Sequence, residues 1–258
     1  MLAVFAHPDD ESFGVGGTLA RYAAEGARVD LVCATRGEEG SVGDPPLCRQ
    51  EDLGKLREGE LRAACEVLGV RTLGFLGCVD GQLDSCPRPT LVGEVVAAIR
   101  ELRPQVVVTF GPDGISGHPD HVAIGRVATE AAAVAANPMA YPEQVARGLR
   151  PWKVSKLYNL APSRSTAVAC EGVGTEEDEA AATARIDVFA YLETKLRAMR
   201  RHRSQCQAFD RLPEEELRER LRWEYFRRAM LDPQAQAGTG YVEEDLFQGI
   251  ARARAVAR

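Results

Sequence analysis

Two short segments of the chain place histidine and aspartate side by side in the same order. Residues 7–10 read HPDD, and residues 118–121 read HPDH. Three of the four histidines in the chain lie in these two segments. Imidazole and carboxylate groups are common ligands of divalent metal ions in catalytic sites. If the fold brings the two segments together, the sequence predicts one shared metal site.

The first segment also has a purely structural interpretation. Pro8 disfavours helical geometry at His7 and suits a turn that leads into a helix. Asp9 and Asp10 would then lie near a helix start, where backbone N–H groups favour negative charge. One carboxylate is enough for that purpose, so a second carboxylate and an imidazole favour a metal site.

Three of these side chains can supply the metal ligands. His7, Asp10 and His121 would leave an open position on the ion, as in catalytic zinc sites, with Asp9 and His118 unbound beside it. A structural zinc site would need four protein ligands, usually thiolates, and no cysteine lies near either segment. Zn²⁺ is therefore the expected ion, although nitrogen and oxygen ligands also suit Fe²⁺ or another divalent metal.

Strand and helix patterns alternate along the first 162 residues. This alternation predicts an α/β, Rossmann-like three-layer fold whose mostly parallel sheet has helices on both faces. Ligands of such sheets bind beyond the carboxyl ends of the strands, so we expect the metal site there. The expected strands are 2–6, 28–35, 71–77, 105–110 and 154–161, and the expected helices are 18–27, 49–68, 90–102 and 120–136.

The length of 258 residues is compatible with one α/β domain. We expect a single domain over residues 1–258, with an α/β core at 1–162 that carries the metal site. Residues 163–258 are expected to form a more variable portion that packs on this core. In that portion we expect a loop or a weak strand pair at 163–179, charged helices at 188–207 and 213–230, and a mobile stretch at 232–240.

Composition argues against several classes of partner. The 32 Lys and Arg residues against 38 Asp and Glu residues give a net charge of −6, which does not indicate a surface for nucleic acid. No apolar run approaches membrane-spanning length, so no membrane partner is expected. The seven cysteines include no C-x-x-C pair and are typical of reduced thiols in the cytoplasm. Homo-oligomer formation is left open.

The motifs carry a resemblance to a known family. "AHPDDE" near the N-terminus and "HPDH" about 110 residues later resemble the LmbE-like or PIG-L family of zinc-dependent N-acetylglucosaminyl deacetylases. The similarity spans most of the chain, because weaker matches extend through it. These are "GVGGTLA", "ATRGEEG", the pair Arg57 and Glu60 ahead of "LGV", Asp80 in "CVDGQL", and "HRSQ".

The resemblance implies a cofactor, a substrate class and roles for the motif residues. His7, Asp10 and His121 would hold the metal, and Asp9 would be the general base that activates water and later protonates the departing amine. The substrate would be a small N-acetylated amino sugar, which loses acetate. His118 would stabilise the oxyanion together with the metal, and Asp120 would orient the His118 ring and keep it charged.

Recognition of the sugar needs fixed polar groups around a cleft. Our candidates are Glu38, Arg57 and Asp80. Arg57 and Glu60 could equally form an ion pair on a helix surface. Some relatives have a tyrosine donor two residues before the second motif, where this chain has Ser116. The last histidine, His202, is more typical of a packing or surface residue.

The same residues are compatible with four other functions. A non-catalytic sugar-binding protein is one, but it would have no use for Asp9 beside a metal. A two-histidine, one-carboxylate Fe(II) oxygenase uses the same ligand types, but the additional Asp9 favours hydrolysis. An amidase could act on a related sugar-linked amide other than an acetyl group. A dinucleotide-binding domain would need G-x-G-x-x-G, which "GVGGT" does not match.

Overall fold

Strand β1 lies near the middle of a seven-stranded sheet with the order β3-β2-β1-β4-β5-β7-β6. The computed structural model describes residues 1–164, 166, 174–231 and 242–250, and all counts refer to these. Strands β1 to β5 run parallel to one another, whereas β7 is antiparallel to both β5 and β6. The strands are β1 (Leu2–Phe5), β2 (Asp30–Cys33), β3 (Thr72–Phe75), β4 (Val106–Phe110), β5 (Lys156–Leu160), β6 (Ala184–Asp187) and β7 (Trp223–Leu231).

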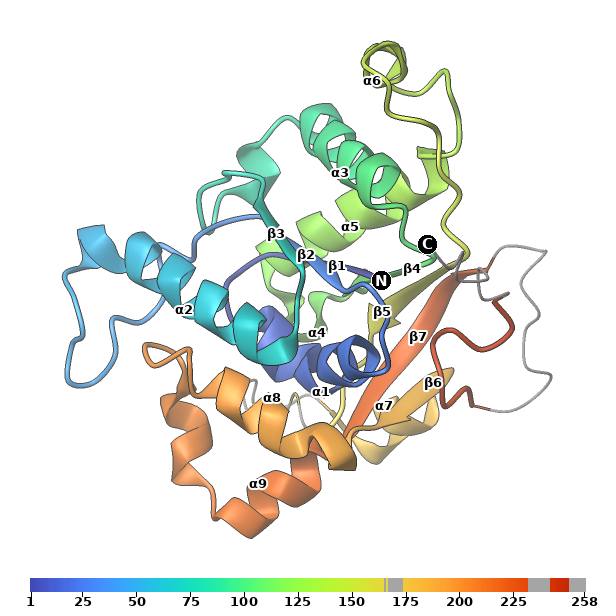
Figure 1. Ribbon diagram of the computed structural model, residues 1–258. Coiled ribbons are helices and arrows are strands. Elements are labelled where there is room, and N and C mark those ends of the chain that lie inside the picture. Colours follow the sequence, from blue (N-terminus) through green and yellow to red (C-terminus); the bar gives the residue numbers. More distant parts are fainter. Residues whose placement is uncertain (165, 167–173, 232–241, 251–258) are drawn as a thin grey trace.

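Helices cover both faces of this sheet, as Figure 1 shows. Helices α1 and α2 lie on one face, with α8 packed against both, and α3 and α5 pack together on the other face. The helices are α1 (Asp10–Ala24), α2 (Leu53–Leu68), α3 (Arg88–Leu102), α4 (Gly114–Gly117), α5 (Pro119–Val134), α6 (Pro142–Ala146), α7 (Glu176–Ala180), α8 (Leu192–Met199) and α9 (Glu214–Leu221). The predicted α/β fold with a mostly parallel sheet is therefore confirmed.

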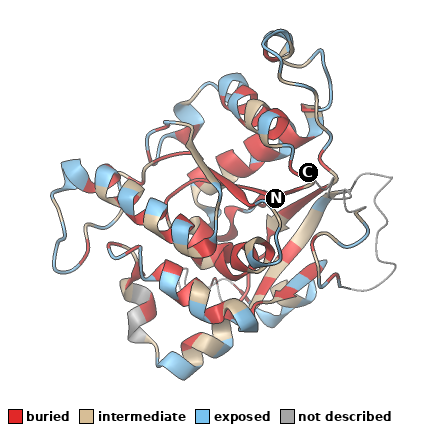
Figure 2. Ribbon diagram, viewed as in Figure 1, coloured by how far each residue is buried: buried red, intermediate tan, exposed pale blue. Residues whose placement is uncertain are grey.

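Two of the apolar runs that predicted strands, those of β1 and β4, are buried along their whole length. Every residue of β1 (LAVF) and of β4 (VVVTF) is buried, which fits strands covered on both faces. Figure 2 shows buried residues on the central strands and on the helix faces turned toward them, while the outer helix surfaces are exposed.

The charged helix expected at 213–230 is a wrong prediction in its second half. Helix α9 ends at Leu221, and β7 begins at Trp223 and inserts between β5 and β6. Glu224 and Phe226 are buried in this strand. Arginine, glutamate and alanine favour helices locally, but pairing with two strands outweighs this preference. The helix expected at 188–207 is also shorter, because α8 covers only Leu192–Met199.

The C-terminal portion adds to the same sheet as the first 162 residues, since β7 pairs with β5. The division of the chain at residue 162 stays a prediction. Within the segment 163–179, which was expected to lack a helix, α7 begins after Thr175, whose side chain caps it. Residues 165 and 167–173 of this segment lie outside the described residues. The stretch 232–240 lies outside them as well. None of the helices in the described part combines the length and apolarity needed to cross a membrane.

The sheet order fixes where the two motifs lie. β1 and β4 are hydrogen-bonded neighbours, with Leu2 opposite Val107. The chain leaves β1 toward α1 on one face and leaves β4 toward α5 on the other face (Figure 1). This is the switch point of the sheet, where a crevice forms at the carboxyl ends of the strands. Residues 7–10 come after the end of β1, and residues 118–121 come after the end of β4.

Candidate metal and catalytic site

Three side chains from the two motifs converge between β1 and β4. His7 Nδ1 lies 3.2 Å from His121 Nε2, and Asp10 Oδ1 lies 3.4 Å from the same nitrogen. His7 Nδ1 and Asp10 Oδ2 are 3.7 Å apart. Metal-binding atoms of His7, Asp10 and His121 all lie within 4.8 Å of one another, so the three residues could hold one ion.

The other nitrogen of each imidazole is held by the protein. His7 Nε2 faces Asp80 Oδ1 at 2.9 Å and Asp120 Oδ2 at 3.2 Å. His121 Nδ1 donates to the Gly114 carbonyl oxygen at 3.1 Å. Partners of this kind fix the ring orientation of metal-binding histidines. They leave Nδ1 of His7 and Nε2 of His121 facing the same point.

A second group of possible ligands shares one residue with the first. His7, His118 and Asp120 also offer atoms within 4.8 Å of one another. The Asp120 carboxylate, however, already accepts hydrogen bonds from the backbone N–H groups of Gly81, at 2.7 Å, and Leu83, at 3.2 Å. Both Asp120 oxygens are thus engaged, whereas in the first group the backbone N–H groups of Ala6 and His7 donate to Asp10 Oδ2 alone and leave Asp10 Oδ1 available to an ion.

Carboxylates dominate the electrostatics around His7. Burial by itself lowers the pKa of His7, but hydrogen bonds to Asp120 and Asp80 outweigh it and raise the pKa to about 10. Burial opposes ionisation of Asp10 and Asp80, yet the neighbouring histidines lower both pKa values, that of Asp80 to about 2. The site therefore favours a positive charge at its centre.

Asp9 lies beside this group and has an unusual backbone conformation. Its φ of 116° lies in a region that favours glycine. The backbone N–H of Asp9 donates to Glu11 Oε2 at 3.0 Å, and Arg57 Nη2 donates to Asp9 Oδ2 at 3.1 Å. Burial raises the pKa of Asp9, and Arg57 acts in the opposite direction. Asp9 is thus held through its carboxylate by Arg57 and through its backbone by Glu11, and it lines the cavity.

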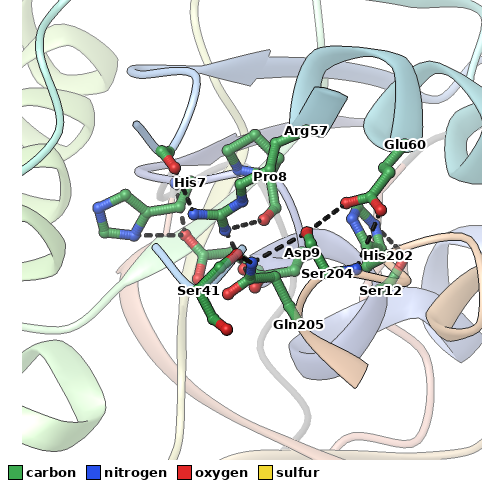
Figure 3. Close-up of polar contacts among 12 residues, drawn as sticks. His7, Pro8, Asp9, Ser12, Ser41, Arg57, Glu60, His202, Ser204 and Gln205 are labelled. Atoms are coloured by element: carbon green, nitrogen blue, oxygen red, sulfur yellow. Dashed lines mark hydrogen bonds and ion pairs between the residues drawn. The ribbon is translucent and has the colours of Figure 1, made fainter. Parts of the chain in front are cut away.

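Arg57, a candidate sugar ligand, reaches from α2 into this turn, as Figure 3 shows. It is 3% exposed and donates to the carbonyl oxygens of Gly37, at 2.8 Å, and Pro8, at 2.6 Å, besides Asp9. Glu60 does not pair with it, since the Glu60 carboxylate accepts from the N–H and the hydroxyl of Ser204. The suggested surface ion pair between Arg57 and Glu60 is therefore absent.

The other two sugar-binding candidates lie differently. Asp80 is buried and contacts His7, and its second oxygen accepts from the Glu39 N–H at 3.1 Å. Glu38 does not line the cavity, because its carboxylate turns back to accept from the Arg36 N–H. The next residue, Glu39, lines the cavity instead.

The expected partnership of His118 and Asp120 is also different in the structure. His118 caps α5: its Nδ1 accepts a hydrogen bond from the Asp120 backbone N–H at 3.2 Å. The Asp120 carboxylate faces His7 and the 81–83 backbone. Burial, together with His121 and His7, lowers the pKa of His118. A nitrogen that accepts at a helix N-terminus cannot carry a proton, so Asp120 does not keep this ring charged.

A cavity of about 430 Å³ opens over these groups. This volume suits a small molecule. Ser116, which occupies the position of the tyrosine donor of some relatives, is exposed and does not line it. The polar lining includes His7, Asp9, Asp10, Glu39, Arg57, Asp80, His118, His121 and Gln205, and the apolar lining includes Phe13, Phe110, Ile115, Leu160 and Phe209.

Sequence reasoning missed a buried network behind Asp9, which Figure 3 shows in part. His202 is fully buried, and its Nε2 lies 2.8 Å from Glu11 Oε1, which also accepts from the Ser12 hydroxyl. Burial lowers the pKa of His202, but Glu11 outweighs this effect and raises it. Gln205 lines the cavity and donates to the Ser41 carbonyl oxygen at 2.7 Å. The only signal for this network in the sequence was the weak "HRSQ" match.

Solved structures with this fold catalyse more than one kind of reaction. N,N'-diacetylchitobiose deacetylase from Pyrococcus horikoshii aligns with a TM-score of 0.68 at 24% identity, covering 88% of this chain and 82% of that one. GalB, the 4-carboxy-2-hydroxymuconate hydratase of Pseudomonas putida KT2440, aligns with a TM-score of 0.67 at 18% identity, covering 92% and 98%. At these identities the likeness shows the fold alone.

Sequence comparison is more specific. A 1D-myo-inositol 2-acetamido-2-deoxy-alpha-D-glucopyranoside deacetylase of Thermobispora bispora is 41% identical over 243 residues, which cover 80% of this chain and 78% of the relative. The sequence profile described as "PIG-L: GlcNAc-PI de-N-acetylase" matches residues 2–132, which contain both motifs. The chain therefore belongs to the PIG-L family, as the motifs predicted.

Proposed function

We propose that this chain is a metal-dependent hydrolase that removes acetate from an N-acetylglucosaminyl compound. The substrate to test first is the N-acetylglucosaminyl-inositol named for its relatives. One observation carries the proposal. His7, Asp10 and His121 converge on one point, and Asp9, a carboxylate outside this ligand group, faces the same cavity.

The donor set fits a divalent metal. His7 Nδ1, Asp10 and His121 Nε2 would hold it, and the opposite ring nitrogens already have the partners that metal-binding histidines usually have. Two imidazoles and one carboxylate with an open position are typical of catalytic zinc, which we propose as the ion. When bound, zinc would polarise the amide carbonyl and acidify a water molecule.

Asp9 would act as the general base. Its carboxylate would take a proton from the water whose oxygen attacks the amide carbon. It would then give this proton to the nitrogen as the C–N bond breaks, so that acetate and a free amine leave. Arg57 and Glu11 keep the carboxylate in place through its side chain and its backbone, respectively. Burial raises the pKa of Asp9, which makes it a better proton acceptor than an exposed aspartate.

His118 would act as a neutral hydrogen-bond donor. Because its Nδ1 accepts from the Asp120 N–H, the remaining ring proton must be on Nε2. An N–H at this place in the cavity wall can donate to the amide oxygen as negative charge develops there. This role needs no imidazolium and agrees with the lowered pKa of His118.

The sugar would be recognised mainly at the cavity rim. We propose that Glu39, whose side chain lines the cavity, accepts hydrogen bonds from sugar hydroxyls, and that Phe13 and Phe209 pack against the sugar ring. Arg57 and Asp80 remain proposed contacts for hydroxyl groups, in addition to their contacts with Asp9 and His7. Glu38 would need to turn from its present hydrogen bond to reach the cavity.

The test is a panel of N-acetylated sugars, with the inositol conjugate among them, incubated with zinc-reconstituted protein. Free amine and acetate should appear in equal amounts. The Fe(II) oxygenase alternative would instead consume oxygen when Fe²⁺ and a 2-oxoacid are supplied, and a different amidase would release amine without acetate. Absence of acetate release across the panel would contradict the proposed reaction.

A further inference from the structure

Two free cysteines lie in contact beside the metal site. The Sγ atoms of Cys78 and Cys86 are 3.0 Å apart, and the Cys86 thiol donates to the Cys78 sulfur. Cys78 is buried and Cys86 is half-buried. A disulfide needs a sulfur separation of about 2.05 Å, so the two atoms are only about 1 Å from bonding distance. Nothing in the proposed deacetylation uses either thiol.

The loop between these cysteines, residues 78–86, holds both carboxylates that face His7 Nε2. Asp80 belongs to the loop and contacts His7 Nε2 at 2.9 Å. The backbone N–H groups of Gly81 and Leu83 donate to Asp120, which is the second partner of His7 Nε2. The position of this loop therefore sets the orientation of a proposed metal ligand.

We propose that Cys78 and Cys86 are a modification site that forms a reversible disulfide, and that this disulfide weakens metal binding by moving the 78–86 loop. The oxidant would be a low-molecular-weight disulfide. The Cys86 thiol, which is the more exposed, would attack one oxidant sulfur as a thiolate and release the first small thiol. Cys78 would then attack the mixed disulfide and release the second, so that two protein thiols become one disulfide and two small thiols form.

Three of the other described cysteines, Cys33, Cys48 and Cys65, are less suited to this reaction. Cys33 and Cys65 are buried, and burial raises the pKa of both thiols, as it does for Cys78, but Cys78 has the more exposed Cys86 thiol in contact with it. The Cys33 thiol faces the carbonyl oxygens of Ala6 and Thr35 rather than a second sulfur. Cys48 is half-buried like Cys86, but it lies in a different groove, together with Arg200 and Arg203. It therefore serves as a control thiol.

The expected effect on the metal follows from the geometry. Closing the sulfur contact by about 1 Å pulls the two ends of the loop together, and Asp80 is only two residues from Cys78. A hydrogen bond of 2.9 Å between Asp80 and His7 does not tolerate a shift of that size. Loss of such a supporting contact typically weakens metal binding by 10–100-fold, and we expect about tenfold here. This effect rests on the proposed metal site, whereas disulfide formation itself does not.

The experiment treats the reduced protein with oxidised glutathione and then measures two quantities. Peptide mapping by mass spectrometry after thiol alkylation identifies which cysteines are linked. Competition with a zinc-binding dye gives the zinc affinity before and after oxidation. The variants are Cys86→Ser, which removes the pair, and Cys48→Ser, which leaves it intact.

Wild type and Cys48→Ser should form the 78–86 disulfide, bind zinc about tenfold more weakly when oxidised, and recover after reduction. Cys86→Ser should form no internal disulfide and should keep its zinc affinity. Two results would overturn the inference: the two sulfurs stay unlinked, or they link and zinc affinity does not change. Because neither measurement uses a sugar substrate, a failed deacetylation assay would not affect this test.

Discussion

The carboxylate of Glu11 accepts a hydrogen bond from the backbone N–H of Asp9, 3.0 Å away. Asp9 has a φ of 116°, a conformation that costs on the order of 1–3 kcal/mol in a residue other than glycine and persists only when neighbours hold it. Glu11 is fixed in turn by His202, which is fully buried. The proposed base is therefore held from behind by residues that do not line the cavity.

Replacing Glu11 with Gln should lower kcat by about tenfold and leave KM within about twofold, since loss of positioning affects the reacting geometry more than binding. Both Glu11 oxygens now accept hydrogen bonds. In Gln an amide nitrogen replaces one of these oxygens and cannot accept, so at least one of the bonds is lost. Steady-state kinetics measure this split, and zinc content should equal that of wild type. Unchanged kcat in a fully metallated variant would refute the positioning role.

Replacing His202 with Ala should destabilise the whole protein. The Glu11 carboxylate, which is 1% exposed, would lose its charged partner. Removing one member of a buried ion pair typically costs about 3–5 kcal/mol. Chemical denaturation of both proteins gives the difference in the free energy of unfolding. A loss below about 1 kcal/mol would mean that the pair is not ionised in the folded protein.

Replacing Asp9 with Asn should separate catalysis from metal binding. The variant keeps the shape of the side chain but cannot accept a proton, so we expect kcat to fall by about 10²–10⁴-fold with normal zinc content. His7→Ala and His121→Ala should instead lose zinc and activity together. Metal analysis and acetate release distinguish the two patterns. Near-normal turnover by Asp9→Asn would require a different base.

Asp80 and Glu38 provide a matched comparison of two candidate sugar ligands. Asp80→Asn removes the charge that faces His7, so zinc affinity should fall by about 10–100-fold. Glu38→Gln changes a side chain outside the cavity, so zinc affinity and KM should both stay close to wild type. Equal effects of the two substitutions on KM alone would show that both residues bind sugar.

Metal binding should depend steeply on pH. In the metal-free protein the pKa of His7 is raised to about 10, whereas an unfolded histidine has a pKa of about 6.5. Zinc must displace the Nδ1 proton, so its affinity should rise about tenfold per pH unit between pH 7 and 9. Calorimetry in buffers of different ionisation enthalpy measures the released proton.

The same shift predicts how the stability of the metal-free protein varies with pH. The protonated His7 ring stabilises the folded state because its pKa is higher in the folded than in the unfolded chain. This stabilisation is fully present at pH values below the unfolded-state pKa, and it disappears as pH rises through the folded-state pKa. The free energy of unfolding should therefore decrease between pH 7 and 10. In His7→Gln this decrease should be absent. Equal pH profiles for the two proteins would contradict the raised pKa.

The sequence was sufficient to predict features that depend on local pattern. Fully apolar runs such as residues 2–5 predicted buried parallel strands, and the paired His-Pro-Asp motifs predicted where chemistry gathers. It failed where long-range partners decide. Residues 223–231 form a strand only because β5 and β6 flank them, and the Asp120 carboxylate takes a direction set by backbone N–H groups about forty residues earlier in the chain.

His7 and His121 are 114 positions apart and meet only because β1 and β4 are neighbours in the sheet. On the ribosome, the N-terminal motif must therefore wait until more than a hundred further residues have been synthesised before its partner appears. The proposed ion would not act as a nucleus for folding, as it does in small zinc-stabilised domains, since one of its three proposed ligands, His121, does not yet exist. If the proposed metal site is correct, the apolar strands assemble first and the metal binds after them.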